Sequence, residues 1–227
     1  MYYSMRPHKI VHIQKIMDCI REGIIAVWKP AGMSSHDVIN RVRRASGIRT
    51  VGHAGTLDPL ARGVLVIGVG RTATRGLAAE VQKEKEYVTT VRLGATSSTD
   101  DEEGEKTPHE VADIPSREAV DAAVQKFVGE IMQVPPIYSA LKIKGKPAYA
   151  YAREGKDVVM QARPVVIKEI EVLSYDYPAI RVRAVTGAGV YIRSLARDIG
   201  VALGTGAYMV DLERTRVGEY TKSQCIQ

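Results

Sequence analysis

Strand patterns in this sequence are grouped into hairpins, and helix patterns lie between the groups. Strands are predicted at 164–175 and 179–186, and the second alternates apolar and polar residues over IRVRA, as a half-buried strand does. The regular succession of strand, helix and strand that builds a parallel sheet is not seen. The sequence therefore predicts the α+β class, with a mixed, largely antiparallel sheet flanked by helices and loops.

The remaining patterns divide the chain into a short leading segment and one larger domain. An amphipathic helix is predicted at 10–22, so that residues 1–22 form an N-terminal extension and residues 23–227 the main domain. The acidic, turn-rich stretch 97–115 is predicted to be a solvated loop. Further strands are predicted at 24–28, 64–69, 87–93 and 207–214. Further helices are predicted at 35–46 (Ser35 as N-cap, Gly47 as C-cap), 116–128, 148–154 and 190–203.

Composition limits the classes of protein to which this chain can belong. No run of about 18 apolar residues occurs, so no segment is expected to span a membrane. The two cysteines are too few for a disulfide framework, and a reducing cytoplasm is the expected location. Residues 1–75 hold 12 basic and four acidic side chains, whereas residues 100–118 hold two basic and eight acidic ones. A basic N-terminal third predicts a polyanionic partner such as a nucleic acid.

Two short patterns that suggest a bound group fail on their context. GVGRTA at 68–73 fits a dinucleotide-binding pattern, but the following strand at 87–93 carries no acidic residue to bind a ribose hydroxyl. His8 and His12 are four residues apart, and no nearby Cys, Asp or Glu completes a metal site. We therefore expect neither a cofactor nor a metal ion.

The densest feature of the chain is the glycine-rich stretch VGHAGTLDPLARGVL at 51–65. Such a loop lets the backbone approach a ligand closely. Asp58 followed by Pro59 is also typical of a simple turn, and the residues alone leave that alternative open. Basic residues flank the stretch, namely Arg41, Arg43, Arg44, Arg49, Arg62, Arg71 and Arg75. A lone carboxylate amid this positive charge is held ionised, which makes Asp58 a candidate nucleophile.

These residues resemble the TruB family of tRNA pseudouridine(55) synthases. GHAGTLDPLARGVL at 52–65 is similar to the family's catalytic motif, and KPAGMSSHDVINRVRR at 29–44 to its opening motif. Later motifs follow in the family's order at 83–87, 134–155, 189–200 and 212–221. The resemblance covers about residues 23–222. It implies the pseudouridine-synthase fold for a catalytic domain over 23–227, without the C-terminal PUA domain that many relatives carry.

The resemblance also implies a role for each catalytic side chain. Asp58 would attack the glycosidic carbon of a uridine or deprotonate its sugar. Tyr87 would stack on the flipped base and help to move a proton. Arg193, in the sequence YIR, would pair with Asp58 and orient it. Without the resemblance, Tyr87 would be interpreted as a core residue of a strand, and Arg193 as a solvated residue of an amphipathic helix.

Contacts to the RNA are implied for a second group of residues. His53 would fill the space that the flipped nucleotide leaves, and Leu212 would pack against the pocket. Lys29, with Pro30, would brace the active-site loop. Phosphate contacts are expected from the basic cluster of residues 29–75, in particular from Arg41, Arg44 and Arg75.

The implied function is the isomerisation of a uridine in the T-arm loop of tRNA by a monomeric enzyme without a cofactor. Two alternatives are a T-arm-binding tRNA-folding chaperone and a guide-dependent pseudouridine synthase that acts on other RNAs. The second alternative depends on a PUA domain, which the sequence lacks. Two residues depart from the family pattern: Trp28 stands where Asp or Asn is commoner, and Ser98 where an Asp is expected.

Overall fold

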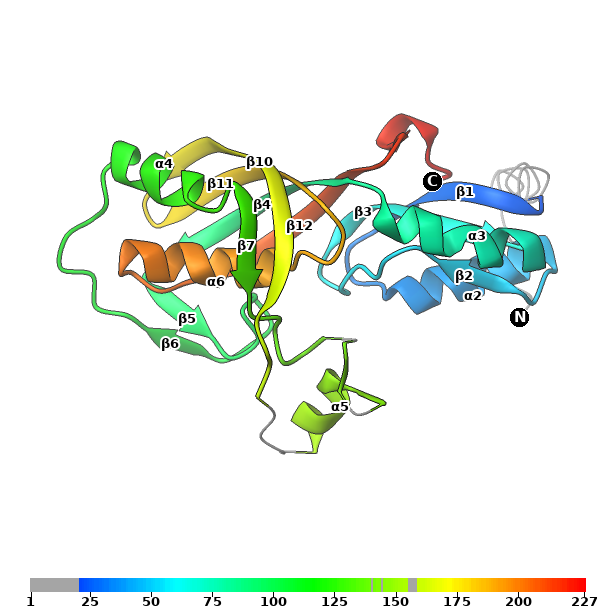
Figure 1. Ribbon diagram of the computed structural model, residues 1–227, viewed down its shortest axis with the longest axis horizontal. Coiled ribbons are helices and arrows are strands. Elements are labelled where there is room, and N and C mark those ends of the chain that lie inside the picture. Colours follow the sequence, from blue (N-terminus) through cyan, green and yellow to red (C-terminus); the bar gives the residue numbers. More distant parts are fainter. Residues whose placement is uncertain (1–20, 140, 144, 155–158) are drawn as a thin grey trace, which may run out of the picture. The chain divides into compact units, whose positions relative to one another are not determined.

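The computed structural model describes residues 21–139, 141–143, 145–154 and 159–227 (Figure 1). The chain divides into two compact units, which are residues 1–83 with 214–227 (unit 1) and residues 84–213 (unit 2). The helix predicted at 10–22 falls almost entirely outside the described residues, and Arg21 and Glu22 are not helical. Within the described residues no helix is long and apolar enough to cross a membrane.

Unit 1 is built around strand β3. Strand β3 pairs antiparallel with β1 over residues 63–69. Its last three residues, 67–69, also pair antiparallel with β2. β12 is the next strand of the same sheet, and the last residues of β12 pair with β13. The elements of this unit are β1 (Gly23–Lys29), α2 (Ser35–Ser46), β2 (Val51–His53), β3 (Arg62–Val69), α3 (Arg71–Gln82), the last four residues of β12 (Ala207–Val217), β13 (Tyr220–Thr221) and η1 (Lys222–Gln224).

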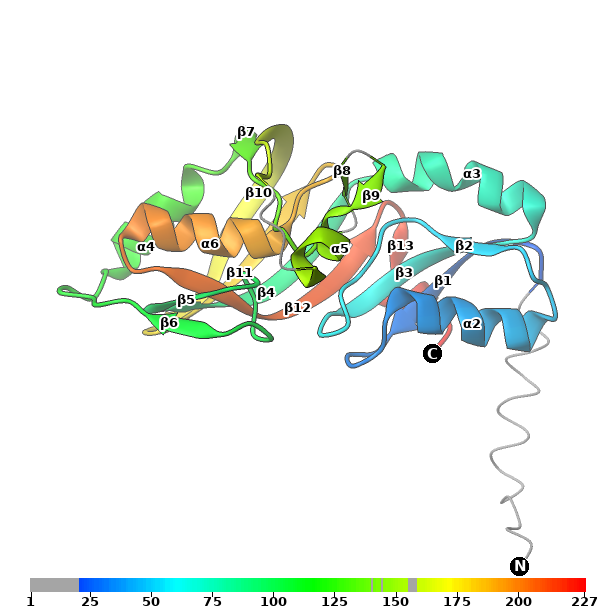
Figure 2. The same cartoon turned by 90° about the horizontal axis from the view of Figure 1, so that it is seen from below.

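Strand β3 is covered by a helix on each face, which explains its unbroken apolar sequence. Leu65, Ile67 and Val69 pack with the buried side chains of α2. Val64 and Val66 point to the other face, where they pack with a leucine of α3. Figure 2 shows the strands of unit 1 between these two helices. The strand predicted at 64–69 is confirmed, while α3 and the short β2 were not predicted.

The start of α2 is fixed by a capping box one residue earlier than predicted. Ser34, and not Ser35, is the N-cap, because its hydroxyl accepts a hydrogen bond from Asp37 N while the Asp37 carboxylate accepts one from Ser34 N. These bonds from Ser34 also lower the pKa of Asp37. Gly47 ends the helix with φ +70°, as predicted.

Unit 2 is an antiparallel sheet in the order β12-β4-β11-β10-β7. Its strands are β4 (Lys85–Leu93), β7 (Gly129–Gln133), β10 (Arg163–Asp176) and β11 (Ala179–Thr186), with part of β12. The hairpin predicted over 164–186 is confirmed, and alternate residues of β10 and β4 are buried. The edge strand β7 was not predicted, and β12 extends three residues beyond its predicted end.

Two helices lie against this sheet and contact one another. Helix α4 packs on β10 and on α6, and α6 packs on β4 (Figure 1). These are α4 (Arg117–Gln125) and α6 (Ile192–Leu203), and a third, short helix is α5 (Ala148–Arg153). Two small hairpins complete the unit, β5 (Ala95–Ser97) with β6 (Lys106–Pro108) and β8 (Lys142–Ile143) with β9 (Lys146–Pro147).

The prediction of a solvated loop over 97–115 is wrong for its first part. Ser97 and Lys106 are paired in the β5–β6 hairpin, and Asp101 is only 3% exposed. Asp100 adopts a positive φ of 62°, which turns the chain so that Met209 N donates to its carbonyl oxygen. The acidic sequence was a poor guide here because two of its carboxylates, those of Asp100 and Asp101, pair with arginines of α6 that are distant in the chain.

Gly63 permits a close approach between two strands of unit 1. Its φ is +128°, and a Cβ at this position would lie 2.2 Å from the carbonyl oxygen of Arg214. A side chain of any size would therefore combine backbone strain with a clash against backbone atoms, which cannot move aside as a flexible side chain can.

The variant Gly63→Ala should lose about 2–4 kcal/mol of unfolding free energy through strain and overpacking. Gly76→Ala is the matched control, because Gly76 lies inside α3 and a Cβ there meets nothing within 4 Å. The control should gain about 0.5–1 kcal/mol from helix propensity. Urea unfolding of both variants measures the difference, and equal stabilities would contradict the close approach.

Candidate functional site

The loop of residues 54–61, here called the Asp58 loop, connects β2 to β3 and is held at several backbone groups. Gly32 N donates to the carbonyl oxygen of Pro59 at 2.8 Å. The Ser35 hydroxyl donates to Leu57 O at 3.0 Å and accepts from Leu57 N at 2.9 Å. Ser35, which was predicted to be the N-cap, thus joins the first turn of α2 to this loop. Asp58 itself is half-buried.

Lys29, the last residue of β1, lies fully buried beneath the same loop. Its side chain is 0% exposed, and its ammonium donates to the carbonyl oxygens of Met33 (2.6 Å), Pro30 (3.0 Å) and Pro59 (3.4 Å). The three donors of one ammonium therefore join the turn after β1 to the residue that follows Asp58. The geometry agrees with the bracing position expected for Lys29 and Pro30.

Burial is the main influence on the charge of Lys29. It lowers the pKa of the ammonium to about 8, and repulsion from Arg214 lowers it further, while attraction from Asp58 and Asp37 opposes both. Lys29 and Asp58 thus lie close enough for each to favour the ionised form of the other. A carboxylate with such a neighbour is available as an anion at neutral pH.

Arg214 is a second buried cation in unit 1, and sequence reasoning missed it. Its side chain is 1% exposed, Nε donates to Val64 O at 2.8 Å, and Nη2 donates to Gly55 O at 3.1 Å. The guanidinium thus bonds to β3 and to the Asp58 loop together. Its place in the family motif at 212–221 was the one available signal, and nothing in the local pattern distinguishes it from Arg216.

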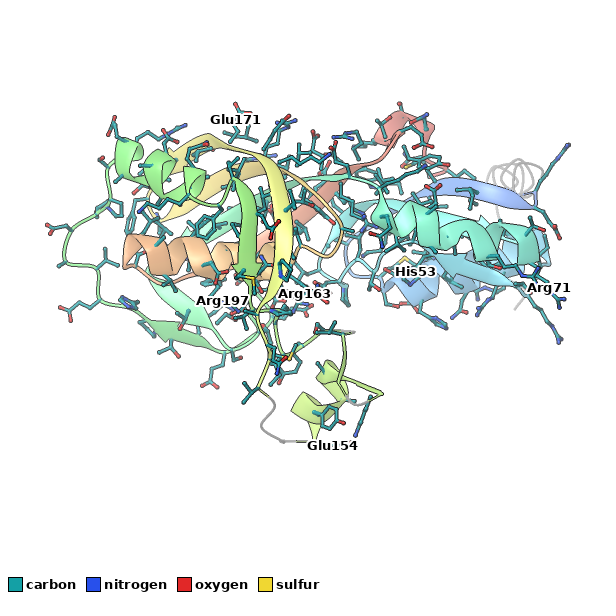
Figure 3. The ribbon with its side chains drawn as sticks, in the orientation of Figure 1. His53, Arg71, Glu154, Arg163, Glu171 and Arg197 are labelled. Carbon is teal, nitrogen blue, oxygen red and sulfur yellow. The ribbon has the colours of Figure 1, made fainter. Side chains whose placement is uncertain are left out.

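His53 ends β2 immediately before the Asp58 loop (Figure 3). Burial lowers the pKa of its imidazole, and the positive charges of Arg214 and His36 lower it further. Its Nδ1 is buried and receives no hydrogen bond within the part of the chain that the structure describes. His53 is therefore a neutral ring at pH 7, suited to stacking and shape complementarity more than to charge.

Tyr87 and Leu212 lie on the neighbouring strands β4 and β12 of unit 2. Both are buried, Tyr87 opposite Ala184 in the register of β4 with β11. Next to Leu212, Asp211 ties the two strands together, because its carboxylate accepts from Thr90 N at 2.7 Å. Hydrogen bonds between neighbouring strands therefore hold the backbone at Tyr87 and at Leu212.

Arg193 lies in the first turn of α6 and is buried, which excludes the solvated alternative. Its side chain is 6% exposed, and Nη1 lies 3.4 Å from Asp101 Oδ2. Nη2 donates to Tyr138 O at 2.9 Å, and Nη1 to Thr99 O at 3.4 Å. Asp101 was not among the predicted site residues, because the acidic stretch had been interpreted as solvated.

Arg197 lies one helical turn after Arg193 on α6 (Figure 3). It makes contacts of the same kind. Its Nη1 donates to Asp100 Oδ2 at 2.8 Å and its Nη2 to Val134 O at 2.9 Å. Burial raises the pKa of Asp100, against the opposing attraction of Arg197 and Arg193. Two consecutive aspartates thus face two arginines spaced by four residues, so the turn of residues 97–104 is fixed to α6.

The predicted phosphate contacts lie on the exposed side of unit 1. Arg41 and Arg44 are exposed on α2, and Arg75 is exposed on α3. A groove of about 690 Å³ on α2 is lined by Met33, Asp37, Asn40, Arg41, Arg43 and Arg44. Arg43 is held within it by hydrogen bonds to Asn40 Oδ1 and Val51 O, both at 3.2 Å.

The two departures from the family pattern have local substitutes. The ammonium of Lys222 lies 4.6 Å from the ring centre of Trp28, a cation–π contact. Ser98 closes the β5–β6 turn, since its hydroxyl accepts from Glu105 N at 3.0 Å. Across the described ranges, no group of three or more His, Cys, Asp or Glu side chains is placed to hold a metal ion.

Comparison with known proteins identifies related sequences over most of the chain. Residues 43–192 match the family model "TruB family pseudouridylate synthase (N terminal domain)", and residues 193–227 match "tRNA pseudouridylate synthase B C-terminal domain". The tRNA pseudouridine synthase B of Thermobifida fusca is 48% identical over 211 residues, which are 89% of this chain and 72% of that protein. The protein of the same name from Mycobacterium tuberculosis (strain H37Rv) is 46% identical over 92% of this chain and 71% of its own length.

Two solved structures match this chain over almost all of its length. A chain of a Cbf5-Nop10-Gar1 complex matches with a TM-score of 0.69 and 31% identity, over 92% of this chain and 52% of its own length. A chain of an H/ACA RNP bound to a substrate RNA containing 2'-deoxyuridine matches with a TM-score of 0.67 and 30% identity, over 97% and 53%. The present chain therefore spans about half the length of these two proteins.

The buried position of Lys29 predicts a specific dependence of stability on pH. Its pKa of about 8 in the folded state lies below the ordinary value of 10.5, so between these pH values the unfolded chain binds more protons than the folded one. The unfolding free energy of the unchanged protein should therefore rise with pH relative to that of Lys29→Met, by up to about 1.4 kcal/mol per pH unit.

Urea unfolding of both proteins at pH 7, 8, 9 and 10 measures this difference. All other titratable groups are common to the two proteins, so the change in the difference reports on Lys29. A difference that stays constant, or that falls as the pH rises, would show that the ammonium keeps an ordinary pKa.

Proposed function

The chain belongs to the TruB family of pseudouridylate synthases, and from this premise we propose that it isomerises a uridine of tRNA to pseudouridine. The reaction breaks the bond between N1 and C1′ and forms a bond between C5 and C1′. C5 gives up a proton and N1 gains one, so the atoms balance without any further reactant. This chemistry needs a carboxylate, a closed pocket for the detached base and side chains that bind the RNA.

The observation that carries the proposal is the fixation of the Asp58 loop. Lys29, Ser35 and Gly32 each bind its backbone, and Lys29 also favours the ionised form of Asp58. A carboxylate held in place by rigid neighbours costs little reorganisation when it reacts. Either attack on C1′ or removal of a sugar proton requires this anion.

Two further side chains complete the proposed catalytic set. Tyr87 stacks on the extruded base and helps to move a proton, for which a buried ring between rigid strands is suited. Arg193 orients the carboxylate of Asp58. Its burial and its bonds to Tyr138 O and Thr99 O support a positioned guanidinium.

RNA binding is proposed for the exposed basic face of unit 1. Arg41, Arg44 and Arg75 contact phosphates of the T-arm stem, His53 fills the space of the flipped nucleotide, and Leu212 lines the base pocket. The catalytic domain spans residues 23–227. We propose further that the enzyme is a cytoplasmic monomer whose substrate uridine is position 55 of the T-loop.

The comparisons favour tRNA over guide-selected RNA as the substrate. Identity to the bacterial tRNA enzymes reaches 48%, and the match covers 72% of their length. Identity to the protein of the Cbf5-Nop10-Gar1 complex is 31%, and about half of that protein is unmatched. A chaperone without catalysis would have no need for an ionised carboxylate on a fixed loop.

The variant Asp58→Asn should bind unmodified tRNA within about threefold of the unchanged protein and give no product, because an amide cannot act as the anion. Asp113→Asn makes the same chemical change on an exposed residue and should keep full activity. Single-turnover assays with mapping of pseudouridine measure both. Product formed by pure Asp58→Asn would reject the assignment, and no product from the unchanged protein would reject the proposed function.

A T-arm hairpin of about 17 nucleotides should be modified nearly as well as intact tRNA, since one groove holds about that length. Arg41→Ala and Arg44→Ala should raise KM more than they lower kcat, because phosphate contacts act on ground and transition states alike. Arg181→Ala, an exposed arginine on β11, is the control. A loss in kcat/KM above about 100-fold for the hairpin would mean that the enzyme reads tRNA beyond the T-arm.

A further inference from the structure

The first turn of helix α6 carries Arg193 and depends on partners from outside the helix. Its N-cap is Tyr191, whose side chain makes no capping hydrogen bond to any residue that the structure describes. The first N–H groups of a helix have no acceptor within the helix itself, and a side chain at the N-cap usually binds one of them. The position of the Arg193 guanidinium therefore depends on which other groups hold this turn.

Gln133, the last residue of β7, binds both backbone groups of this N-cap. Its Oε1 accepts from Tyr191 N at 2.8 Å, and its Nε2 donates to Tyr191 O at 3.1 Å. A backbone N–H can only donate and a carbonyl oxygen can only accept, so one orientation of the carboxamide satisfies both groups. With 1% exposure, Gln133 makes these bonds away from water, where the loss of a partner is costly.

The segment that follows β7 binds the same turn at two further places. The Ser194 hydroxyl donates to Val134 O at 2.8 Å, and Arg193 Nη2 donates to Tyr138 O at 2.9 Å. Both acceptors lie within five residues of Gln133 in the sequence. The start of α6 therefore cannot shift relative to the end of β7 without breaking these bonds.

Strand β10 reinforces the arrangement through the residue that pairs with Gln133 in the sheet. Arg163, which is labelled in Figure 3, lies opposite Gln133 in the register of β10 with β7. Its Nη2 donates to Gly189 O at 2.6 Å, and its guanidinium lies 5.2 Å from the ring centre of Tyr191, a cation–π contact. Two cross-strand neighbours thus hold the backbone that leads into α6.

We propose that Gln133 is a positioning residue for the reaction, which binds Tyr191 and thereby fixes the first turn of α6 and the guanidinium of Arg193. The inference rests on the proposed function, in which Arg193 orients the carboxylate of Asp58. A guanidinium orients a carboxylate through a rigid planar fork, so a small displacement of its helix turn disturbs the geometry. Gln133 touches no reacting atom in this role, and its loss should lower the rate of reaction without weakening the binding of RNA.

A double-mutant cycle tests whether Gln133 acts through Arg193. Gln133→Leu has a side chain of similar size without the two bonds, so its single-turnover rate on unmodified tRNA should fall about 10-fold or more. In the background of Arg193→Lys, which lacks the planar fork, the same substitution should lower the rate by less than about threefold. The Kd for tRNA should stay within about threefold of that of the unchanged protein in each variant.

Gln125→Leu is the matched control. Gln125 Nε2 also donates to a backbone carbonyl oxygen, that of Ile170 at 3.0 Å, and this bond joins α4 to β10. The control therefore makes the same chemical change in unit 2 and removes a bond in which α6 takes no part. It should keep the rate of the unchanged protein. Thermal unfolding of all variants shows that each is folded at the temperature of the assay.

The ratio of the two rate losses decides the inference. It is overturned if Gln133→Leu lowers the rate less than about threefold, or if its rate losses in the two backgrounds agree within about threefold. A larger loss in the unchanged background supports it. A normal rate in Arg193→Lys would reject the role proposed for Arg193. Product from Asp58→Asn, or none from the unchanged protein, would instead reject the proposed function.

If Gln133→Leu does not fold, or if the double variant is too slow to measure, Gln133→Glu decides. Its protonated carboxyl group has one donor and one acceptor and can satisfy both groups of Tyr191, whereas the ionised carboxylate cannot donate. Its single-turnover rate relative to that of the unchanged protein should therefore fall about 10-fold between pH 5.5 and pH 8.5, with folding checked by circular dichroism at each pH. A fall of less than about threefold overturns the inference.

Discussion

Two buried cations under the Asp58 loop are the constraint on which the structure of unit 1 depends. A charge removed from water is tolerated only with hydrogen-bond partners, and Lys29 and Arg214 find theirs in backbone carbonyl groups. Those carbonyls belong to the turn after β1, to the Asp58 loop and to β3. If the loop left its position, both buried cations would lose hydrogen bonds to its carbonyl oxygens. The same hydrogen bonds therefore satisfy the two buried charges and fix the Asp58 loop.

The long strands of the sheet could be predicted from the sequence because they carry their own signals, whereas the short strands β2 and β7 could not. Alternation marked β11, and an unbroken apolar run marked β3, since one strand has a single buried face and the other has two. Helix α3 lacked such signals: its N-cap is Gly70, which has no side chain to cap it, and Gly76 weakens its interior. Its helical state depends on Leu77 packing against β3, a tertiary contact that no local pattern contains.

The candidate site was predictable where chemistry lies in one segment and unpredictable where it joins distant ones. Asp58 and His53 stand in one dense motif, and Lys29 followed from the resemblance. Asp101 was interpreted as solvated because it is one of eight acidic residues between positions 100 and 118, yet it lies beside Arg193. Charge counts along a chain describe the average surface and give no information about which carboxylate has a buried partner.

The two units provide different partners for their buried cations. In unit 2, the Arg193 guanidinium lies beside the Asp101 carboxylate, so two opposite charges are buried together. In unit 1, the hydrogen bonds described for Lys29 and Arg214 all end on neutral backbone carbonyl oxygens, two of which belong to the Asp58 loop. These bonds form when the chain folds, before any RNA binds. A loop that is fixed in advance reorganises little during a reaction.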